Sequence, residues 1–185
     1  MPECALKTCG ILRPFEVDRD LDSLADLIEV AFGEELRKTG NHMVEDMRRM
    51  ASWGRLLNWT PGALPLYSGF VWVEDDRIVG NVSYAREADR GEWQVSNVAV
   101  HPDYRRRRIA SRLLDAAIEE IRAQKGERVL LQVRSDNALA HHLYDRRGFC
   151  VYDTVKEYGL HPRDWPLMLG VQRRLDPIGR WCNSA

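Results

Sequence analysis

One stretch of sequence decides the fold: Val98-Ala99-Val100-His101-Pro102-Asp103-Tyr104-Arg105-Arg106-Arg107-Arg108-Ile109-Ala110-Ser111-Arg112-Leu113-Leu114. Residues 98–100 are apolar and partly β-branched, which suits a buried strand. Pro102 ends that strand, because proline cannot donate a ladder hydrogen bond. After the turn, apolar residues recur on one helical face: Ile109, Leu113, Leu114, Ala117, Ile118 and Ile121. The stretch therefore predicts a strand, a turn and a helix over about residues 106–124.

Four consecutive arginines, 105–108, stand at the predicted start of this helix. A helix N-terminus carries about half a positive charge, so each nearby cation costs roughly 0.3–1 kcal/mol. An anion bound to the unpaired backbone N–H groups would offset this cost, and phosphate commonly binds at such strand-to-helix turns. The pattern favours a phosphate-binding turn over the alternative, a solvated basic run.

Length and composition place the chain among soluble globular proteins. With 185 residues we expect a single domain, its core at about residues 10–175 and a polar C-terminal tail at 176–185. The formal net charge of −1 argues against a nucleic-acid partner held by bulk charge. No apolar run reaches about 18 residues, so we expect no membrane partner. The scattered cysteines (Cys4, Cys9, Cys150 and Cys182) lack metal-ligand spacing and suggest free thiols, no metal and a cytoplasmic location.

Hydrophobic periodicity and turn residues predict mixed α/β structure around one largely antiparallel sheet. Asp18 or Asp20 is expected to cap the first helix, and Gly33 to end it. A second helix is expected to begin near Asn41. The predicted elements are strand 10–15, two helices, a hairpin of strands 66–73 and 78–84, strand 93–100, helix 106–124, strand 129–133, helix 137–147, and strands 149–155 and 167–173.

In two stretches the chain resembles the GNAT N-acetyltransferases. Their acetyl-CoA loop reads Gln or Arg, two residues, Gly, one residue, then Gly or Ala. Arg105 fills the first position and Ala110 the last, whereas Arg108 stands where Gly is usual. A second block, residues 137–149, fits Asn-x-x-Ala-x-x-Leu-Tyr-x-x-x-Gly-Phe. The resemblance implies the GNAT fold: α/β, with a mixed, mainly antiparallel sheet of six or seven strands flanked by four helices.

The resemblance also implies acetyl-CoA as acyl donor, with no metal. The backbone N–H groups of residues 106–110 would cradle the pyrophosphate at the helix N-terminus. By the same analogy, the pantetheine amides pair with exposed backbone as an added strand. Asn137 either contacts the pantetheine arm or caps a helix, and both roles are compatible. The residues expected to bind the cofactor are Val98, Val100, Arg105, Arg106, Arg107, Arg108, Ile109, Ala110, Ser111, Asn137 and Tyr144.

Three residues are expected to carry catalysis. The resemblance puts the N–H of Val98 near the thioester carbonyl, as an oxyanion donor, and Tyr144 as the acid that protonates the departing thiolate. The alternative for Tyr144 is a packing role on an amphipathic helix. The family often has a carboxylate on the strand before the loop, but the matching residue here is Gln94. Glu92, two residues earlier on the same face, is the candidate base through water; the alternative is an ordinary exposed strand-end Glu.

These residues predict an N-acetyltransferase that transfers an acetyl group to a primary amine by direct attack in a ternary complex. The sequence does not identify the acceptor, a small molecule or a peptide, which in this architecture would be contacted by residues 33–65 and 158–165. Glu34 and Glu35 could attract a cationic acceptor, or could be ordinary acidic residues at a helix end. The rival hypotheses are a non-catalytic acetyl-CoA sensor and, more weakly, nucleic-acid binding through the arginine run. A homodimer is possible.

Overall fold

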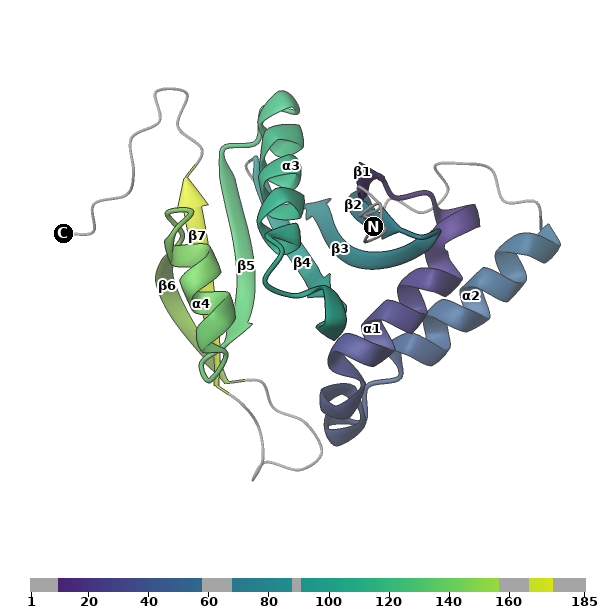
Figure 1. Ribbon diagram of the computed structural model, residues 1–185. Coiled ribbons are helices and arrows are strands. Elements are labelled where there is room, and N and C mark those ends of the chain that lie inside the picture. The colour runs from purple at the N-terminus through teal and green to yellow at the C-terminus, as the bar shows by residue number, and fades with distance from the viewer. Residues whose placement is uncertain (1–9, 58–67, 88–90, 157–166, 175–185) are drawn as a thin grey trace, which may run out of the picture.

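The computed structural model describes residues 10–57, 68–87, 91–156 and 167–174, which form one sheet with helices on both faces (Figure 1). In this part of the chain there are seven strands and four α-helices, in the predicted order and with the predicted mixed α/β class. The elements are β1 (Ile11–Pro14), α1 (Val17–Thr39), α2 (Met43–Leu57), β2 (Ser68–Glu74), β3 (Arg77–Arg86), β4 (Glu92–Val100), a short 3-10 helix (Pro102–Tyr104), α3 (Ile109–Ala123), β5 (Arg128–Arg134), α4 (Ala138–Asp145), β6 (Cys150–Lys156) and β7 (Leu167–Arg174).

The strands lie in the order β1-β2-β3-β4-β5-β7-β6. Neighbouring strands pair antiparallel except β4 and β5, which are parallel. That parallel pairing extends only over Glu92–Val95 and Arg128–Leu131. Beyond Val95 the two strands are no longer hydrogen-bonded to each other, so the centre of the sheet is open at one end.

A β-bulge in β4 accompanies this opening. Asn97 has a φ of 50°, and the β3–β4 register shifts between Asn81 and Ser83. Because a bulge adds one residue to one strand, it changes which side chains face each side of the sheet. Before the bulge, Val95 packs into the core beneath α3; after it, Ala99 packs into the core beneath α1 and α2.

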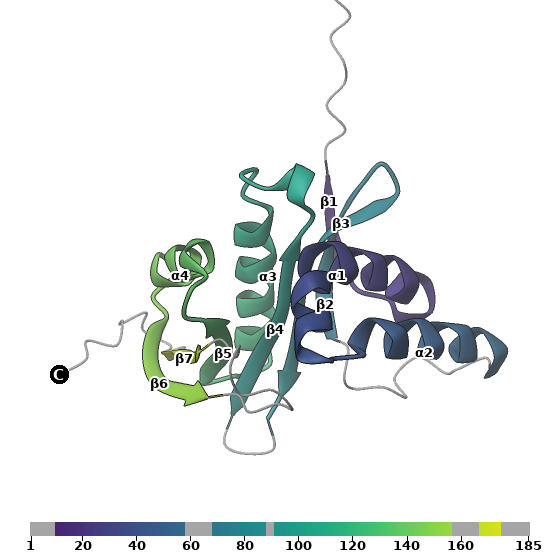
Figure 2. The same cartoon turned by 90° about the horizontal axis from the view of Figure 1, so that it is seen from below.

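The two cores lie on opposite faces of the sheet. Helix α3 covers one face with the six apolar residues that its periodicity predicted, all buried. Helices α1 and α2 cover the other face, where Met47 is buried and Met43 and Met50 pack at its edge. Figure 2 shows α1 and α3 on either side of β4. The methionine stripe of α2 is therefore core filling for the most part.

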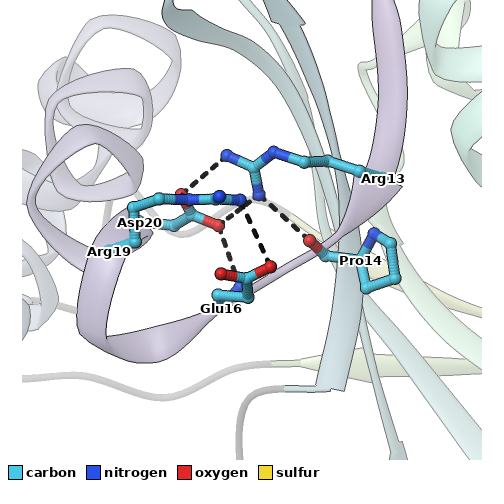
Figure 3. A network of polar contacts seen from close by, with 5 residues as sticks. All are labelled: Arg13, Pro14, Glu16, Arg19 and Asp20. Atoms are coloured by element: carbon cyan, nitrogen blue, oxygen red, sulfur yellow. Dashed lines mark hydrogen bonds and ion pairs between the residues drawn. The ribbon is translucent and has the colours of Figure 1, made fainter.

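Helix α1 begins and ends at residues other than those predicted. Asp20 does not cap the helix but lies in its first turn, buried, where it accepts hydrogen bonds from Arg13, Arg19 and the Glu16 N–H (Figure 3). This network fastens the end of β1 to the start of α1. Gly33 does not end the helix, which continues to Thr39 and closes at Gly40 with a φ of 65°.

Helix α3 also begins later than predicted. Arg108 is its N-cap and has a φ of 62°, so the four arginines lie in the turn before the helix rather than in its first turn. The left-handed conformation of Arg108 turns the chain into the helix axis. On α4, Leu139 is 81% exposed, whereas Tyr144 and the following Phe149 are part of the core.

Candidate functional site

The open edge of β4 is the framework of the site. The N–H of His101 donates to the carbonyl of Val79 on β3 at 2.9 Å. Backbone polar groups of alternate residues in a strand point to the same side. The N–H and C=O groups of Val98 and Val100 therefore point away from β3, toward the gap between β4 and β5. This gap offers main-chain groups to an extended ligand, although the Val100 carbonyl already accepts from Nε of Arg105.

Two cavities meet along this gap. The strand cavity, about 460 Å³, lies between β4, β5 and the C-terminal end of α1. The turn cavity, about 660 Å³, extends from β4 to the arginine turn and α4. They share these lining residues: Phe32, Glu35, Val98, Arg134, Asn137, Ala140 and Tyr144. The site is a continuous channel with a basic end and an end at the α1–α2 junction.

The arginine turn presents backbone amides at the basic end. Arg106 and Arg108 both have left-handed φ values, 61° and 62°. The first backbone hydrogen bond of α3 is donated by Arg112 to the carbonyl of Arg108 (3.1 Å), so the N–H groups of residues 109–111 precede the helical ladder. All five of Arg106, Arg108, Ile109, Ala110 and Ser111 line the turn cavity. A helix N-terminus built this way suits an anion.

Two of the four arginines have side chains engaged with the protein. Arg105 lines the turn cavity and donates from Nε to the carbonyl of Val100 (3.3 Å). Arg107 lies outside the described cavity linings and donates to both carboxylate oxygens of Glu74 at 2.8 Å. Its guanidinium also lies 5.3 Å from the centre of the Tyr104 ring. Arg107 thus fastens the turn to β2, whereas Arg106 and Arg108 line the turn cavity.

Tyr144 lies where the two cavities meet. It is 7% exposed and packs against Phe149, with ring centres 5.7 Å apart. Burial raises the pKa of its hydroxyl to about 12, so the phenol keeps its proton at neutral pH. The packing role and the acid role considered for this residue are compatible, since the ring fills the core while the residue lines the channel.

Asn137 has the capping role and also lines both cavities. Its Oδ1 accepts from the Ala140 N–H (3.1 Å), and the residue is the N-cap of α4. Nε2 of His141 lies 2.9 Å from the Arg134 carbonyl and fixes the start of the helix against the end of β5. With the start of α4 held in this way, Asn137 is part of the channel wall.

The structure does not bring Glu92 to the channel. Glu92 lies at the first residue of β4 and accepts from Nη1 of Arg128 at 2.8 Å. Six residues of strand separate it from Val98, about 20 Å at the usual rise. Glu92 lines neither cavity. Its position is that of a structural ion pair between the paired ends of β4 and β5.

Sequence reasoning missed other residues in the channel. Arg134, at the end of β5, lines both cavities and forms ion pairs with Glu35 (2.9 Å) and Asp136 (2.7 Å). The hydrogen bonds that Arg134 donates raise the pKa of its guanidinium; the bond to Asp136 has the largest effect and the bond to Glu35 the next largest. Gln132 lines the strand cavity. Arg134 and Gln132 could have been predicted from their position just before the Asn137 block, on a strand expected to border the site.

Within residues 10–57, 68–87, 91–156 and 167–174, no group of His, Cys, Asp and Glu side chains is arranged to hold a metal ion. No helix in the same ranges has the length and apolar character needed to cross a membrane. Trp59 and residues 158–165, expected near an acceptor, lie outside the described residues.

The part of the chain that forms this channel is similar to a known protein family. Residues 24–149 match the model of the acetyltransferase (GNAT) family, and these residues include both sequence blocks and the channel. The chain belongs to the GNAT family. The resemblance drawn from the arginine turn and the Asn137 block is therefore confirmed, as is the predicted fold.

Two curated GNAT relatives are similar in sequence. N-alpha-acetyltransferase 30 of Schizosaccharomyces pombe is 29% identical over 98 residues, 51% of this chain and 65% of that protein. The ribosomal protein bS18-alanine N-acetyltransferase of Haemophilus ducreyi is 31% identical over 117 residues, 62% of this chain and 77% of that protein. The chain thus spans just under two thirds of the first relative.

Solved GNAT structures share the fold. The ribosomal-protein-S18-alanine N-acetyltransferase of Escherichia coli superposes with a TM-score of 0.67 at 19% identity, covering 96% of this chain and 99% of that one. The yncA protein of Salmonella typhimurium, solved with its cofactor acetyl-CoA, gives 0.69 at 20% identity, covering 95% and 99%. At these identities the likeness supports the fold alone.

Proposed function

We propose that this GNAT protein transfers an acetyl group from acetyl-CoA to a primary amine. The observation that carries the proposal is the channel itself, with an open strand edge in the middle, a helix N-terminus at one end and a protonated tyrosine at the junction. The names of the two curated relatives favour a peptide α-amine as acceptor, with a small-molecule amine as the other class.

The chemistry of the channel lining supports acetyl-CoA as the donor. The amides before α3, with Arg106 and Arg108 beside them, supply donors and positive charge for the pyrophosphate. The main-chain groups of Val98 and Val100 supply a strand edge for the two pantetheine amides. Asn137 and the exposed Leu139 border the same cavity. The side chain of Arg107, held by Glu74, contributes to the position of the turn rather than to the anion.

The reaction then uses groups at the junction. Acetyl-CoA supplies an activated thioester, whose carbonyl carbon the acceptor nitrogen attacks, so that the C–N bond forms and the C–S bond breaks. The N–H of Val98 donates to the carbonyl oxygen as negative charge develops there. Tyr144 gives its proton to the leaving sulfur, and solvent restores it. An acceptor that arrives as an ammonium ion loses one proton to solvent before the attack, because only the free amine has a lone pair. The nitrogen loses a second proton to solvent once the C–N bond has formed.

Thiol release tests this proposal directly. Purified protein is incubated with acetyl-CoA and a panel of small amines and short peptides with free N-termini, and free CoA is followed over time. We expect turnover with at least one class, no turnover with the N-acetylated peptides, and saturable CoA binding by calorimetry. Absence of saturable CoA binding at millimolar concentrations would overturn the proposal.

A further inference from the structure

The strand cavity has a distinct electrostatic character. Its charged lining residues in the described part of the chain are Glu35 and Arg134. They form an ion pair of 2.9 Å between the C-terminal part of α1 and the end of β5. Arg134 also pairs with Asp136 at 2.7 Å, so two carboxylates share one guanidinium. Glu35 and Arg134 line both cavities, so this cluster lies where the strand cavity and the turn cavity meet.

The structure separates two adjacent acidic residues of α1. Glu34 is exposed, lines neither cavity and pairs with Lys38 one turn along the helix at 2.7 Å. Glu35 is about one third exposed and lines both cavities, together with Tyr144 and Val98. Only one of the two acidic residues therefore faces the place where acyl transfer is proposed.

We infer that Glu35 recognises the acceptor as a cationic amine. This inference rests on the proposed acetyl transfer. A primary amine with an ordinary pKa reaches the channel as an ammonium ion, which donates hydrogen bonds and carries one positive charge. Glu35 accepts a hydrogen bond from that ammonium where the two cavities meet. Arg134 stays neutralised meanwhile, because Asp136 retains two hydrogen bonds to it (2.9 and 2.7 Å).

Glu35 is therefore a specificity-determining residue, and its effect on binding depends on the charge of the acceptor. A charge-assisted hydrogen bond is strong enough for its loss to weaken binding by about 10- to 100-fold. A neutral nucleophile of the same shape gains little from the carboxylate. The backbone amides proposed to hold the pyrophosphate belong to the arginine turn, so we expect acceptor binding to depend on Glu35 more than CoA binding does.

The test compares two peptides of the same sequence that carry different nucleophiles at the N-terminus. The first probe is a short alanine-initiated peptide with a free α-amine; the second carries an aminooxyacetyl group at its N-terminus, which is uncharged at pH 7. Thiol release from acetyl-CoA is measured for wild type, Glu35→Gln and the matched control Glu34→Gln. For Glu35→Gln we expect kcat/KM to fall about 10- to 100-fold with the cationic peptide, mainly through KM, and less than about twofold with the aminooxy peptide. Glu34→Gln should resemble the wild type with both.

A second variant separates recognition from the ion pair. Arg134→Gln breaks the same bridge as Glu35→Gln but keeps the carboxylate, so the KM of the cationic peptide should stay at or below the wild-type value. Equal losses with both peptides, or equal KM increases in Glu35→Gln and Arg134→Gln, would show a structural bridge and overturn the inference alone. If the wild type binds CoA yet acetylates no amine in the panel, the proposed function fails and the inference falls with it.

Discussion

Arg107 donates from Nη2 to both carboxylate oxygens of Glu74, 2.8 Å from each, and so joins the arginine turn to strand β2. Glu74 is 6% exposed and also accepts from Nε1 of Trp72 at 2.9 Å. A carboxylate this deeply buried requires charge-matched donors. One member of the basic run therefore fixes the turn in place, while its neighbours face the channel.

Replacing Arg107 by Met should destabilise the protein more than replacing Arg106 by Met. The first change leaves the buried Glu74 carboxylate with Trp72 as its remaining side-chain donor among the described residues, and we expect a loss of about 2–3 kcal/mol. Arg106→Met alters a solvated side chain and should stay within about 0.5 kcal/mol. Urea unfolding at pH 7 measures both. Equal losses would mean that the ion pair does not hold the turn.

Arg108 offers a test of backbone strain. Its φ of 62° is unfavourable for a side chain with a Cβ, by roughly 1–2 kcal/mol, but not for glycine. Arg108→Gly should therefore be about 1 kcal/mol more stable than Arg108→Ala, although both lose the same charge. Thermal and urea unfolding compare the two variants. The prediction is wrong if Arg108→Ala proves equally stable.

Tyr144→Phe should separate turnover from binding. Loss of the proton donor is expected to lower kcat by about 10²- to 10⁴-fold, with the Kd for CoA changed by less than about threefold, because the ring still fills its place beside Phe149. Since burial raises the pKa of Tyr144 to about 12, the acid stays protonated as pH rises through 10. Deprotonation of Tyr144 should therefore cause no loss of wild-type kcat at pH values up to about 10. Retained turnover in Tyr144→Phe would remove the residue from the mechanism.

Asp20 should contribute stability that disappears in acid. Burial by itself raises the pKa of Asp20, but hydrogen bonds from Arg13, the Glu16 N–H and Arg19 outweigh it and hold the pKa below its usual value. The unfolded chain therefore binds this proton more tightly than the folded one. The stabilisation is present above the unfolded pKa of about 3.9 and is lost as pH falls through the folded pKa.

The measurement for Asp20 is the free energy of unfolding as a function of pH. Asp20→Asn should be less stable than wild type at pH 7 and should approach it between about pH 5 and pH 2. Asp18→Asn changes an exposed neighbour in the same helical turn and should follow the wild-type curve. A constant difference between Asp20→Asn and wild type across this range would contradict the linkage.

Two glycines of α1 and its cap should respond to alanine in opposite directions. Gly33 is helical and a Cβ there would approach only the flexible side chains of Arg37 (3.3 Å) and Glu29 (3.4 Å), so Gly33→Ala should stabilise by about 0.5–1 kcal/mol. Gly40 has open space around it but a φ of 65°, so Gly40→Ala should cost about 1 kcal/mol. Chemical denaturation of the pair gives the sign of each effect.

Much of the fold followed from local patterns. The apolar face of α3, the β2–β3 hairpin, the Asn137 cap and the element order are encoded by residues near one another in sequence, whose periodicity and turn chemistry act locally. The predicted boundary of α1 was wrong where a second local signal competed with the first. Gly33 could have ended α1, but strong helix formers follow it and Gly40 provides the left-handed cap.

The site divided in the same way. The arginine turn was identified from its charge pattern, and Val98, Asn137 and Tyr144 from the resemblance to the GNAT family. The structure brings all of them to one channel. Glu92 was chosen for its residue type and strand face, yet the length of β4 keeps it at the far end with Arg128. Arg107 was grouped with its neighbours because sequence carries no information about Glu74, which lies 33 positions earlier.

The amino-acid sequence by itself determined the elements, their order and the family pattern, because each depends on residues within a few turns of one another. Only the tertiary structure decided which arginine anchors the turn, that β4 and β5 separate after Val95, and that Glu35 rather than Glu34 faces the channel. These features depend on contacts between segments distant in the chain, where a bulge or a one-residue rotation of a helix changes which side chain meets which partner.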